Sequence, residues 1–429
     1  MRDILLTQPY KGTEDLLFED FQIQKYIFDI WRDTCLKFNY KEYITPVLEN
    51  SRIYKAKSGA VKDELFTLKD RGDRDLALRP EMTPSVTRVV SSIYKEVSKP
   101  IRLFSIANFF RNEAPQKGRL REFWQLNYDI FGSESLDADG EIMSIAIEIM
   151  LAFKAPAGSF KLLFSNRILV NELFDLLKID PSVRIETARI MDKYSNLPKS
   201  DIVSQFKKNN LDQNTVDCLI LFLESSNSDF SNKFPTLFNG KGYSQIKYLI
   251  DYLNKLGYSD YFEFKPSIIR GFDYYDGIIF EIYDQNPNNK RSLFGGGRYN
   301  GLGEIFGQEN IPATGFAPGS ATTKLFLENW NLIPDFIKND TYYMPYLPNT
   351  DLEKNLNLAR KIRSKGKVVE TDFYIKSISD AIRYANKQNF QNILIYGENE
   401  QKNGQISIKN LSENDQTIKS LENFLSDIS

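Results

Sequence analysis

The stretch FFRNEAPQKGRLREFWQLNYDIFG (residues 109–132) places two strand-like runs on either side of a charged loop, APQKGRL. Because side chains alternate along a β-strand, Arg111 and Glu113 are expected on one face of the first run. The same alternation places four residues on one face of the second run: Phe123, Gln125, Asn127 and Asp129. Arginine can clamp a phosphate, glutamate can accept from an adenine amino group and phenylalanine can stack on the ring, so the hairpin predicts a nucleotide site. A solvated hairpin tip is the alternative interpretation, since charged turns are common.

The regions around this hairpin predict an antiparallel sheet. Short alternating runs recur from residue 60 to 135, interrupted by one helical pattern, PSVTRVVSSIYKEV. Strand patterns return at 270–284 and 292–307, after a stretch at 165–260 in which Leu and Ile recur at helical spacing. This order predicts an α+β fold, with an antiparallel sheet flanked by helices and a mostly helical insert at 165–260, rather than a parallel doubly wound sheet.

A second, smaller domain is predicted near the end of the sequence. Polar residues and a proline mark a linker at 331–340, and beyond it strand and helix patterns alternate. Such alternation over roughly 90 residues is typical of a small α/β domain. We therefore expect a larger domain at 1–330 and an α/β domain at 341–429.

Composition excludes several kinds of chemistry. The 429 residues are 41% hydrophobic and 26% charged and contain no histidine, so imidazole acid–base catalysis and His-ligated zinc are excluded. Chemistry must depend on Arg, Lys, carboxylates, Tyr and magnesium. No apolar run approaches the roughly 18 residues of a membrane span, and the N-terminus resembles no secretory signal. Two distant cysteines favour a reducing compartment, so we expect a cytoplasmic protein that does not associate with membranes.

Five blocks of the sequence resemble the histidyl-tRNA synthetases, a family of class II aminoacyl-tRNA synthetases. The 109–132 hairpin resembles motif 2, YKEYITPVLEN (40–50) resembles the dimer-forming motif 1 with its Pro46, and LALRPEMTPSVTR (76–88) resembles the amino-acid-binding strand. RGFDYYDGIIFEIYD (270–284) is similar to the histidyl signature, and 295–323 to motif 3. In addition to these five blocks, ILIYGENEQKNGQISIKNL (393–411) resembles the family's anticodon-binding domain. Five blocks in register are a far more specific signal than one.

The resemblance implies a catalytic domain at 1–330, an anticodon-binding-like domain at 341–429, and a homodimer. It also implies a reaction in which L-histidine is activated with ATP and then transferred to tRNA(His). The attacking substrate carboxylate is already ionised near neutral pH, so charge neutralisation and alignment can suffice in a protein without histidine.

The resemblance also implies roles for individual residues. Arg111 and Arg270 would be catalytic, acting on the α-phosphate and the substrate carboxylate from opposite sides. The other ATP-binding residues would be Glu113, Arg119 and Phe123. The histidine-binding residues, besides the two catalytic arginines, would be Glu81, Thr83, Gln125, Asp129, Tyr274 and Tyr275. Magnesium would accompany the polyphosphate, and no motif assigns it a protein ligand.

Contacts with tRNA are expected in two places. The motif 2 loop would contribute Gln116 and Lys117. In the C-terminal domain the basic run at 360–367 predicts contact with tRNA phosphates, and the resemblance adds Glu400; the candidates there are Arg360, Lys361, Arg363 and Glu400. A solvated helix end is the alternative interpretation of the basic run.

The sequence departs from the family in motif 3. Alignment on Gly315 and Gly319 puts Thr322 where the family carries an arginine for the γ-phosphate, and Lys324 is rotated by about 200° around a helix from that position. Ala114 and Asn300 also replace an arginine and an aspartate. Three functions remain open: a divergent histidine–tRNA ligase, a non-charging paralogue that binds histidine or ATP as a regulator, and an adenylating enzyme with another acceptor.

Overall fold

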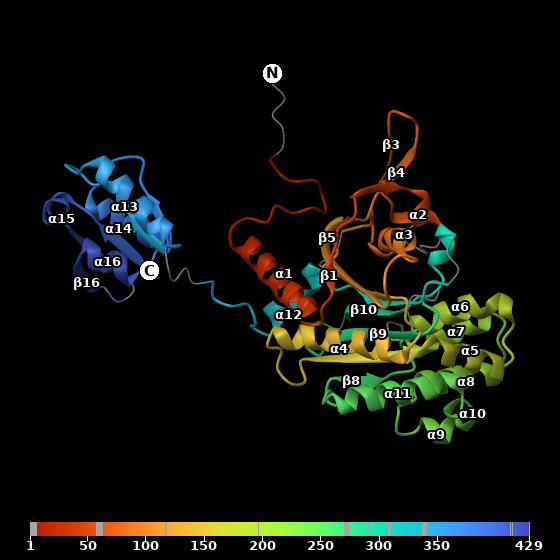
Figure 1. The fold of residues 1–429 in the computed structure, drawn as a ribbon. Helices are drawn as coiled ribbons and strands as arrows, with labels where there is room; N and C mark the ends of the chain where they lie inside the picture. Colours follow the sequence, from red (N-terminus) through yellow and green to blue (C-terminus); the bar gives the residue numbers. More distant parts are fainter. Residues whose placement is uncertain are drawn as a thin grey trace. The chain divides into compact units, whose positions relative to one another are not determined.

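The computed structural model describes residues 7–56, 63–115, 118–195, 197–269, 275–289, 292–307, 310–336, 341–411, 413 and 415–428. The chain divides into two compact units, Met1–Ile333 and Pro334–Ser429, each with its own sheet and helices (Figure 1). Part of the expected linker, at 337–340, lies outside the described residues. None of the helices formed by the described residues is long and apolar enough to cross a lipid bilayer.

The first unit is built on an eight-stranded sheet. Its neighbouring strands are antiparallel except for the two outermost pairs, which are parallel. In spatial order they are β1 (Lys41–Glu42), β5 (Ile101–Phe110), β6 (Glu122–Phe131), β11 (Ala313–Phe316), β10 (Ser292–Arg298), β9 (Ile278–Asp284), β7 (Phe160–Asn166) and β8 (Phe262–Phe264).

Alternation along β5 and β6 divides their side chains between two apolar cores. Leu126, Tyr128 and Ile130 belong to the larger core. That core also takes side chains from α1 (Glu19–Lys37), α4 (Leu136–Ala152) and α12 (Ser320–Asn329). Phe123 and Phe131 belong to the core on the other face, with residues of α3 (Thr83–Ile93) and the 3-10 helix η2 (Gly303–Phe306) nearby. Figure 1 shows α3 and α4 on opposite sides of the sheet.

A buried ion pair joins α4 to the middle of the large sheet. Arg298 of β10 donates to the Asp139 carboxylate (2.7, 2.9 and 3.0 Å) and to two carbonyl oxygens just before the helix. Since an uncompensated buried charge costs several kcal/mol, removing either partner should destabilise the unit strongly.

Two further groups of elements complete the first unit. A three-stranded antiparallel sheet carries α2 (Arg52–Lys55) beside it, in the order β2 (Leu48–Asn50), β4 (Asp75–Leu78) and β3 (Thr67–Lys69). The segment between β7 and β8 is helical, with α5 (Arg167–Leu176), α6 (Pro181–Asp192), α7 (Lys199–Lys208), α8 (Gln213–Leu223), α9 (Phe230–Lys233), α10 (Pro235–Phe238) and α11 (Lys241–Lys255).

The second unit is a five-stranded mixed sheet with helices. Its strands run in the order β13 (Val368–Thr371), β12 (Thr341–Met344), β14 (Asn392–Ile395), β15 (Gln405–Asn410) and β16 (Asp415–Ser420), the first three parallel. The helices are α13 (Leu352–Ser364), α14 (Ile378–Lys387), α15 (Glu398–Asn403) and α16 (Leu421–Asp427). The predicted α+β fold with a C-terminal α/β unit is confirmed.

Candidate active site

The predicted side chains of the motif 2 hairpin gather on the α3 side of the large sheet. We call this surface the site face; it comprises Leu103, Ser105, Ala107 and Phe109 of β5 with Phe123, Gln125, Asn127 and Asp129 of β6. The two strands are antiparallel and pair Phe109 with Phe123 and Ser105 with Asn127. Paired residues of neighbouring strands share a face, so both strands present these side chains together.

Asp129 is the buried acid of the site face. Tyr299 donates to its Oδ1 through a short hydrogen bond, while Oδ2 has no hydrogen-bond partner among the described residues. Burial raises the pKa of Asp129 to about 7, and the Tyr299 hydroxyl opposes that rise. Its neighbour on β11 must be glycine, because a Cβ at Gly315 would lie 2.1 Å from Asp129 Oδ1.

Arg111 lies at the end of the same strand pair, over an aromatic ring. Its Nε donates to the Pro80 carbonyl (3.1 Å), and its guanidinium carbon is 5.1 Å from the Phe123 ring centroid. Anchoring through Nε leaves the terminal nitrogens available to a bidentate anion. Glu113 and Arg119 form a loose pair at 3.5 Å, and the Arg119 side chain is 63% exposed. An exposed pair of this kind contributes little, about 0–1 kcal/mol, so Arg119 can leave it readily.

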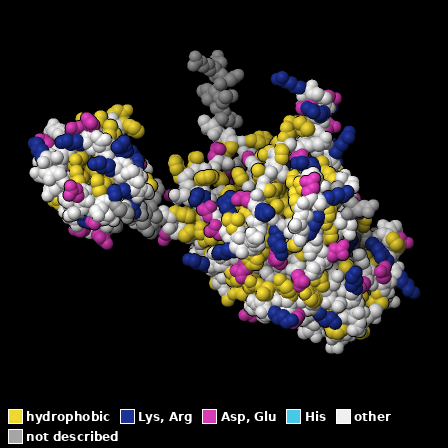
Figure 2. Space-filling view, viewed as in Figure 1, with side chains coloured by type: hydrophobic (Ala, Val, Ile, Leu, Met, Phe, Trp, Pro, Cys, Tyr) yellow, Lys and Arg dark blue, Asp and Glu magenta, His cyan; other side chains and the backbone are white. Residues whose placement is uncertain are grey.

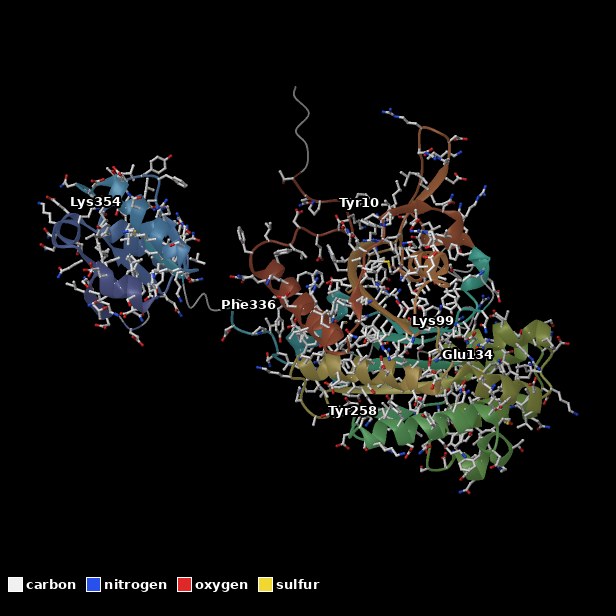
Figure 3. All side chains as sticks on the ribbon, viewed as in Figure 1. Tyr10, Lys99, Glu134, Tyr258, Phe336 and Lys354 are labelled. Atoms are coloured by element: carbon white, nitrogen blue, oxygen red, sulfur yellow. The ribbon has the colours of Figure 1, made fainter. Side chains whose placement is uncertain are left out.

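The loop between β5 and β6 is tied to the N-terminal segment. Arg121 donates to the Tyr10 hydroxyl (2.7 Å, Tyr10 labelled in Figure 3) and to the Glu113 carbonyl (3.1 Å). The Arg121 backbone N–H also donates to the Gly12 carbonyl (2.7 Å). These bonds hold the strand that carries Phe123 in a fixed position relative to the chain around residue 10.

Glu81 and Thr83 reach the same region from the small sheet. Both side chains are half-buried, and Thr83 is the first residue of α3. The neighbouring Arg79 is buried and donates to the backbone carbonyls of Asn108 (2.9 Å) and Thr45 (2.6 Å). Arg79 thus joins β4 to β5 and fixes the position of Glu81 relative to Arg111, a structural role that the sequence interpretation did not assign.

Several predicted residues lie outside the described part of the chain, namely Arg270, Tyr274, Gln116 and Lys117. Tyr275 is described and packs against the apolar core on the α3 side of the sheet, the core that includes Ala107 and Phe109 of the site face. Its ring lies so near β10 that a Cβ at Gly297 would be 2.9 Å from Tyr275 Cδ1.

The motif 3 helix presents no free cation at the position of the family's arginine. The Thr322 hydroxyl lies 2.9 Å from the Leu293 carbonyl of β10 and 3.0 Å from the Gly319 carbonyl. Lys324 forms an ion pair with Asp20 of α1 (2.7 Å). The positive charge of Lys324 is therefore held on α1, and Thr322 joins the start of α12 to the sheet.

The tRNA candidates of the second unit lie at opposite ends of its sheet. Arg360, Lys361 and Arg363 are exposed at the end of α13, which leads into the start of β13. Glu400 follows the end of the parallel β14 and accepts from the Gly397 N–H (3.1 Å) and the Ser407 hydroxyl (3.0 Å). Because β13 and β14 are both parallel to β12, these two groups are separated by the length of the strands.

Three residues of the site were missed by sequence reasoning. Tyr299 follows the GGGR run and binds Asp129 from 170 positions away, a contact that no local pattern signals. Tyr43 has a buried hydroxyl without a partner among the described residues, and the charge of Asp129 helps to raise its pKa. Asn127 appeared in the alternation but received no role.

Comparisons with known proteins show what this chain is similar to in sequence and in fold. A family model described as histidyl-tRNA synthetase matches residues 12–320, and one described as an anticodon binding domain matches residues 346–429. The histidine–tRNA ligase of Leptospira biflexa is 38% identical over 99% of this chain and 98% of its own length. That of Halobacterium salinarum is 32% identical over 96% of both chains. A crystal structure of the histidyl-tRNA synthetase from Nostoc sp. superposes with a TM-score of 0.84 at 21% identity, covering 99% of each chain, which is a likeness of fold.

Proposed function

Because the chain belongs to the histidyl-tRNA synthetase family, we propose that its site face activates histidine through positioned charge, without a side-chain base. The chain is a ligase that joins L-histidine to tRNA(His) using ATP. In the first step a substrate carboxylate oxygen bonds to the α-phosphorus of ATP, and the bond from that phosphorus to pyrophosphate breaks. In the second step a terminal ribose hydroxyl of tRNA takes the histidyl group and AMP leaves.

Arg111 is our candidate for the charge that neutralises the reacting phosphate. The Nε contact with Pro80 and the Phe123 ring restrict its guanidinium to one region of the site face. A fixed cation needs little reorganisation when negative charge develops, which is the main electrostatic advantage an enzyme has over water. Arg270 is the proposed partner from the other side of the transition state.

For the nucleotide, we assign adenine to Phe123 and Glu113 and the outer phosphates to Arg119. Phe123 offers a ring already packed against Phe109, with centroids 6.0 Å apart, so stacking needs little ordering. Magnesium enters as part of the MgATP substrate. The described residues contain no cluster of three carboxylate or thiol side chains that could hold a resident metal ion, and magnesium is commonly held by substrate phosphates.

The observation that carries the proposal for histidine is that Oδ2 of Asp129 has no hydrogen-bond partner among the described residues. A buried carboxylate oxygen without a partner costs free energy that an imidazole N–H can recover. Glu81 and Thr83 are assigned to the α-ammonium group, and Gln125, Tyr274 and Tyr275 to the rest of the substrate. Apolar isosteres of histidine would leave these groups unpaired and should be rejected strongly.

Histidine-dependent ATP–pyrophosphate exchange followed by charging of tRNA(His) tests this function. We expect both activities. Exchange without charging would favour another acceptor, and histidine binding without exchange would favour a regulator.

Thr322→Arg is expected to leave exchange within about threefold of wild type. Since the chain works with an uncharged residue there, Arg119 can carry the outer phosphate charge, and a second cation adds little. Losing the hydroxyl contacts with Leu293 and Gly319 should cost roughly 1 kcal/mol, seen as a lower unfolding temperature. Thr322→Val is the control, with the same loss of stability and no added charge. A tenfold or larger gain in exchange would show that the site lacks a phosphate cation.

For tRNA, we propose that residues 341–429 form an anticodon-binding domain whose contact surface includes the 373–375 loop. Phe373 and Tyr374 are 93% and 79% exposed. The loop is held at both ends, because Asp372 accepts from the Tyr343 hydroxyl (2.5 Å) and Lys376 pairs with Asp372 (2.7 Å). Fixed exposed aromatic rings suit stacking on unpaired bases. Figure 2 shows hydrophobic side chains on the visible surface of this unit.

The double variant Phe373→Ala, Tyr374→Ala should raise the KM for tRNA(His) about 10- to 100-fold, since stacking contributes roughly 1–3 kcal/mol per base. Exchange should stay unchanged, because this step needs no tRNA. Ile418→Ala, which removes another exposed apolar side chain of the same unit, is the control. Unchanged charging by the double variant would exclude the loop from the tRNA surface.

We also infer a homodimer formed through the motif 1 region. Exposed apolar side chains flank Pro46 there, including Ile44, Val47 and Leu48. Burying them against a second copy would remove an apolar patch from water. Sedimentation of the full chain tests this inference and should give twice the chain mass of 49.7 kDa.

The reaction partners and the free thiols of Cys35 and Cys218 support a cytoplasmic location.

A further inference from the structure

Asn127 is buried on the site face without a hydrogen-bond partner for its amide nitrogen. Its side chain is only 3% exposed, and Nδ2 finds no acceptor among the described residues. More than nine in ten buried polar groups in proteins are paired, and an unpaired donor costs about 1–3 kcal/mol. A purely structural role leaves this cost unexplained.

The residues opposite Asn127 and Gln125 on β5 are small. Its partner on β5 is Ser105, whose hydroxyl is also buried and unpaired among the described residues, and the next pair along joins Gln125 to Ala107. On the other side, Gly315 of β11 pairs with Asp129. The site face therefore carries small side chains beside Asn127.

Asn127 and Asp129 together offer complementary hydrogen-bonding groups. They are two residues apart on one strand, a separation of roughly 6.6 Å. Within the described part of the chain, the amide donor of Asn127 and the Oδ2 acceptor of Asp129 have no hydrogen-bond partner. Neutral imidazole carries one N–H donor and one acceptor nitrogen, whereas imidazolium carries two donors. A carboxylate alone would favour imidazolium. An amide N–H facing the second ring nitrogen would oppose its protonation.

We propose that Asn127 determines specificity for L-histidine by donating from Nδ2 to the unprotonated ring nitrogen while Asp129 accepts from the ring N–H. This inference rests on the proposed histidine site and adds to it the selection of the neutral ring. Asn127 thereby favours ligands that have an unprotonated second ring nitrogen, a discrimination that Asp129 alone cannot provide.

A cycle of enzyme and substrate changes tests this contact. Pyrrol-2-ylalanine and pyrrol-3-ylalanine each keep one ring N–H and replace the other nitrogen by carbon. Wild type should prefer L-histidine to the better of these analogues by about 10- to 100-fold in kcat/KM for exchange. Asn127→Ala should lose that preference, because its activity with histidine should fall while its activity with the analogues stays unchanged. An equal loss with both substrates would indicate a packing role, and an unchanged preference would exclude the contact.

The stability of the variant separates the two roles further. Asn127→Ala removes an unpaired donor, so its unfolding temperature should stay level or rise. The control is Ser165→Ala on β7, which removes from the same sheet a buried hydroxyl that has no partner in the described part of the chain, and it should leave exchange unchanged. A clear fall in the unfolding temperature of Asn127→Ala would favour a structural asparagine.

Nitrogen NMR gives a readout that needs no turnover. The chain contains no histidine, so imidazole signals report the bound substrate alone. With 15N-labelled L-histidine at pH 6, where the free ring is mostly protonated, wild type should bind a ring with one unprotonated nitrogen and Asn127→Ala a doubly protonated ring. A doubly protonated ring in wild type overturns the proposal. If wild type neither binds histidine nor catalyses exchange, the proposed function itself fails. If wild type binds histidine without exchange, the NMR comparison still tests the role of Asn127.

Discussion

Arg111→Lys is expected to lower histidine-dependent ATP–pyrophosphate exchange about a thousandfold, because losing one well-placed charged donor has effects of that order. The guanidinium has one nitrogen bonded to the Pro80 carbonyl and lies over the Phe123 ring. Lysine has the same charge but neither the planar fork nor the second anchoring nitrogen. The loss should appear in kcat more than in KM, since the charge acts on the transition state.

The matched control is Arg74→Lys in the β3–β4 hairpin. Arg74 pairs with the carboxylate of Asp70 (2.6 Å) and is exposed, far along the small sheet from the site face. It should leave exchange unchanged. Arg111→Lys should shift the unfolding temperature by only a few degrees, because it removes about one hydrogen bond. Exchange within tenfold of wild type would refute the electrostatic role of Arg111.

The sequence predicted the site best where the information is local. Alternation within residues 109–132 placed Phe123, Gln125 and Asp129 on one face, and β5 and β6 pair in the register that this requires. Side chains alternate between the two faces of a strand, so the register of β5 and β6 is strongly constrained once one face is buried. A shift of the register by one residue would expose the apolar side chains to solvent. Helices such as α3 and α4 were similarly predictable from apolar spacing.

Contacts between distant segments could not be predicted in this way. Tyr299 meets Asp129, and Arg298 meets Asp139, across about 160 to 170 positions. Neither pair leaves a periodic signal. Among the alternating runs between residues 60 and 135, ELFTLKD and LALRP contain β3 and most of β4 of a separate sheet, and alternation could not distinguish them because pairing partners depend on tertiary packing. The short helix α15, with the sequence ENEQKN, contains no apolar residue and therefore has no apolar periodicity that could predict it.

Asp129→Asn is expected to change activity and stability in opposite directions. Exchange should fall about 100-fold or more, because the amide N–H would face the substrate N–H from which, as we propose, Oδ2 accepts. Burial raises the pKa of Asp129 from 3.8 to about 7 in the folded chain. Between those values the folded chain holds a proton that the unfolded chain has released, so the free energy of unfolding falls as pH rises through this window. Asparagine carries no such proton.

Thermal unfolding at pH 4 and pH 8, together with exchange assays, measures both effects. The variant should unfold near the wild-type temperature at pH 4 and above it at pH 8, where wild type carries the full cost of an ionised buried carboxylate. Asp139→Asn is the contrasting control, since it leaves Arg298 buried and unpaired and should destabilise the chain at both pH values. If Asp129→Asn also loses stability at pH 8, Asp129 supports the fold rather than the substrate. A gain in stability together with a loss of activity would show that the buried Asp129 carboxylate destabilises the free protein and is retained because it forms a hydrogen bond with bound histidine.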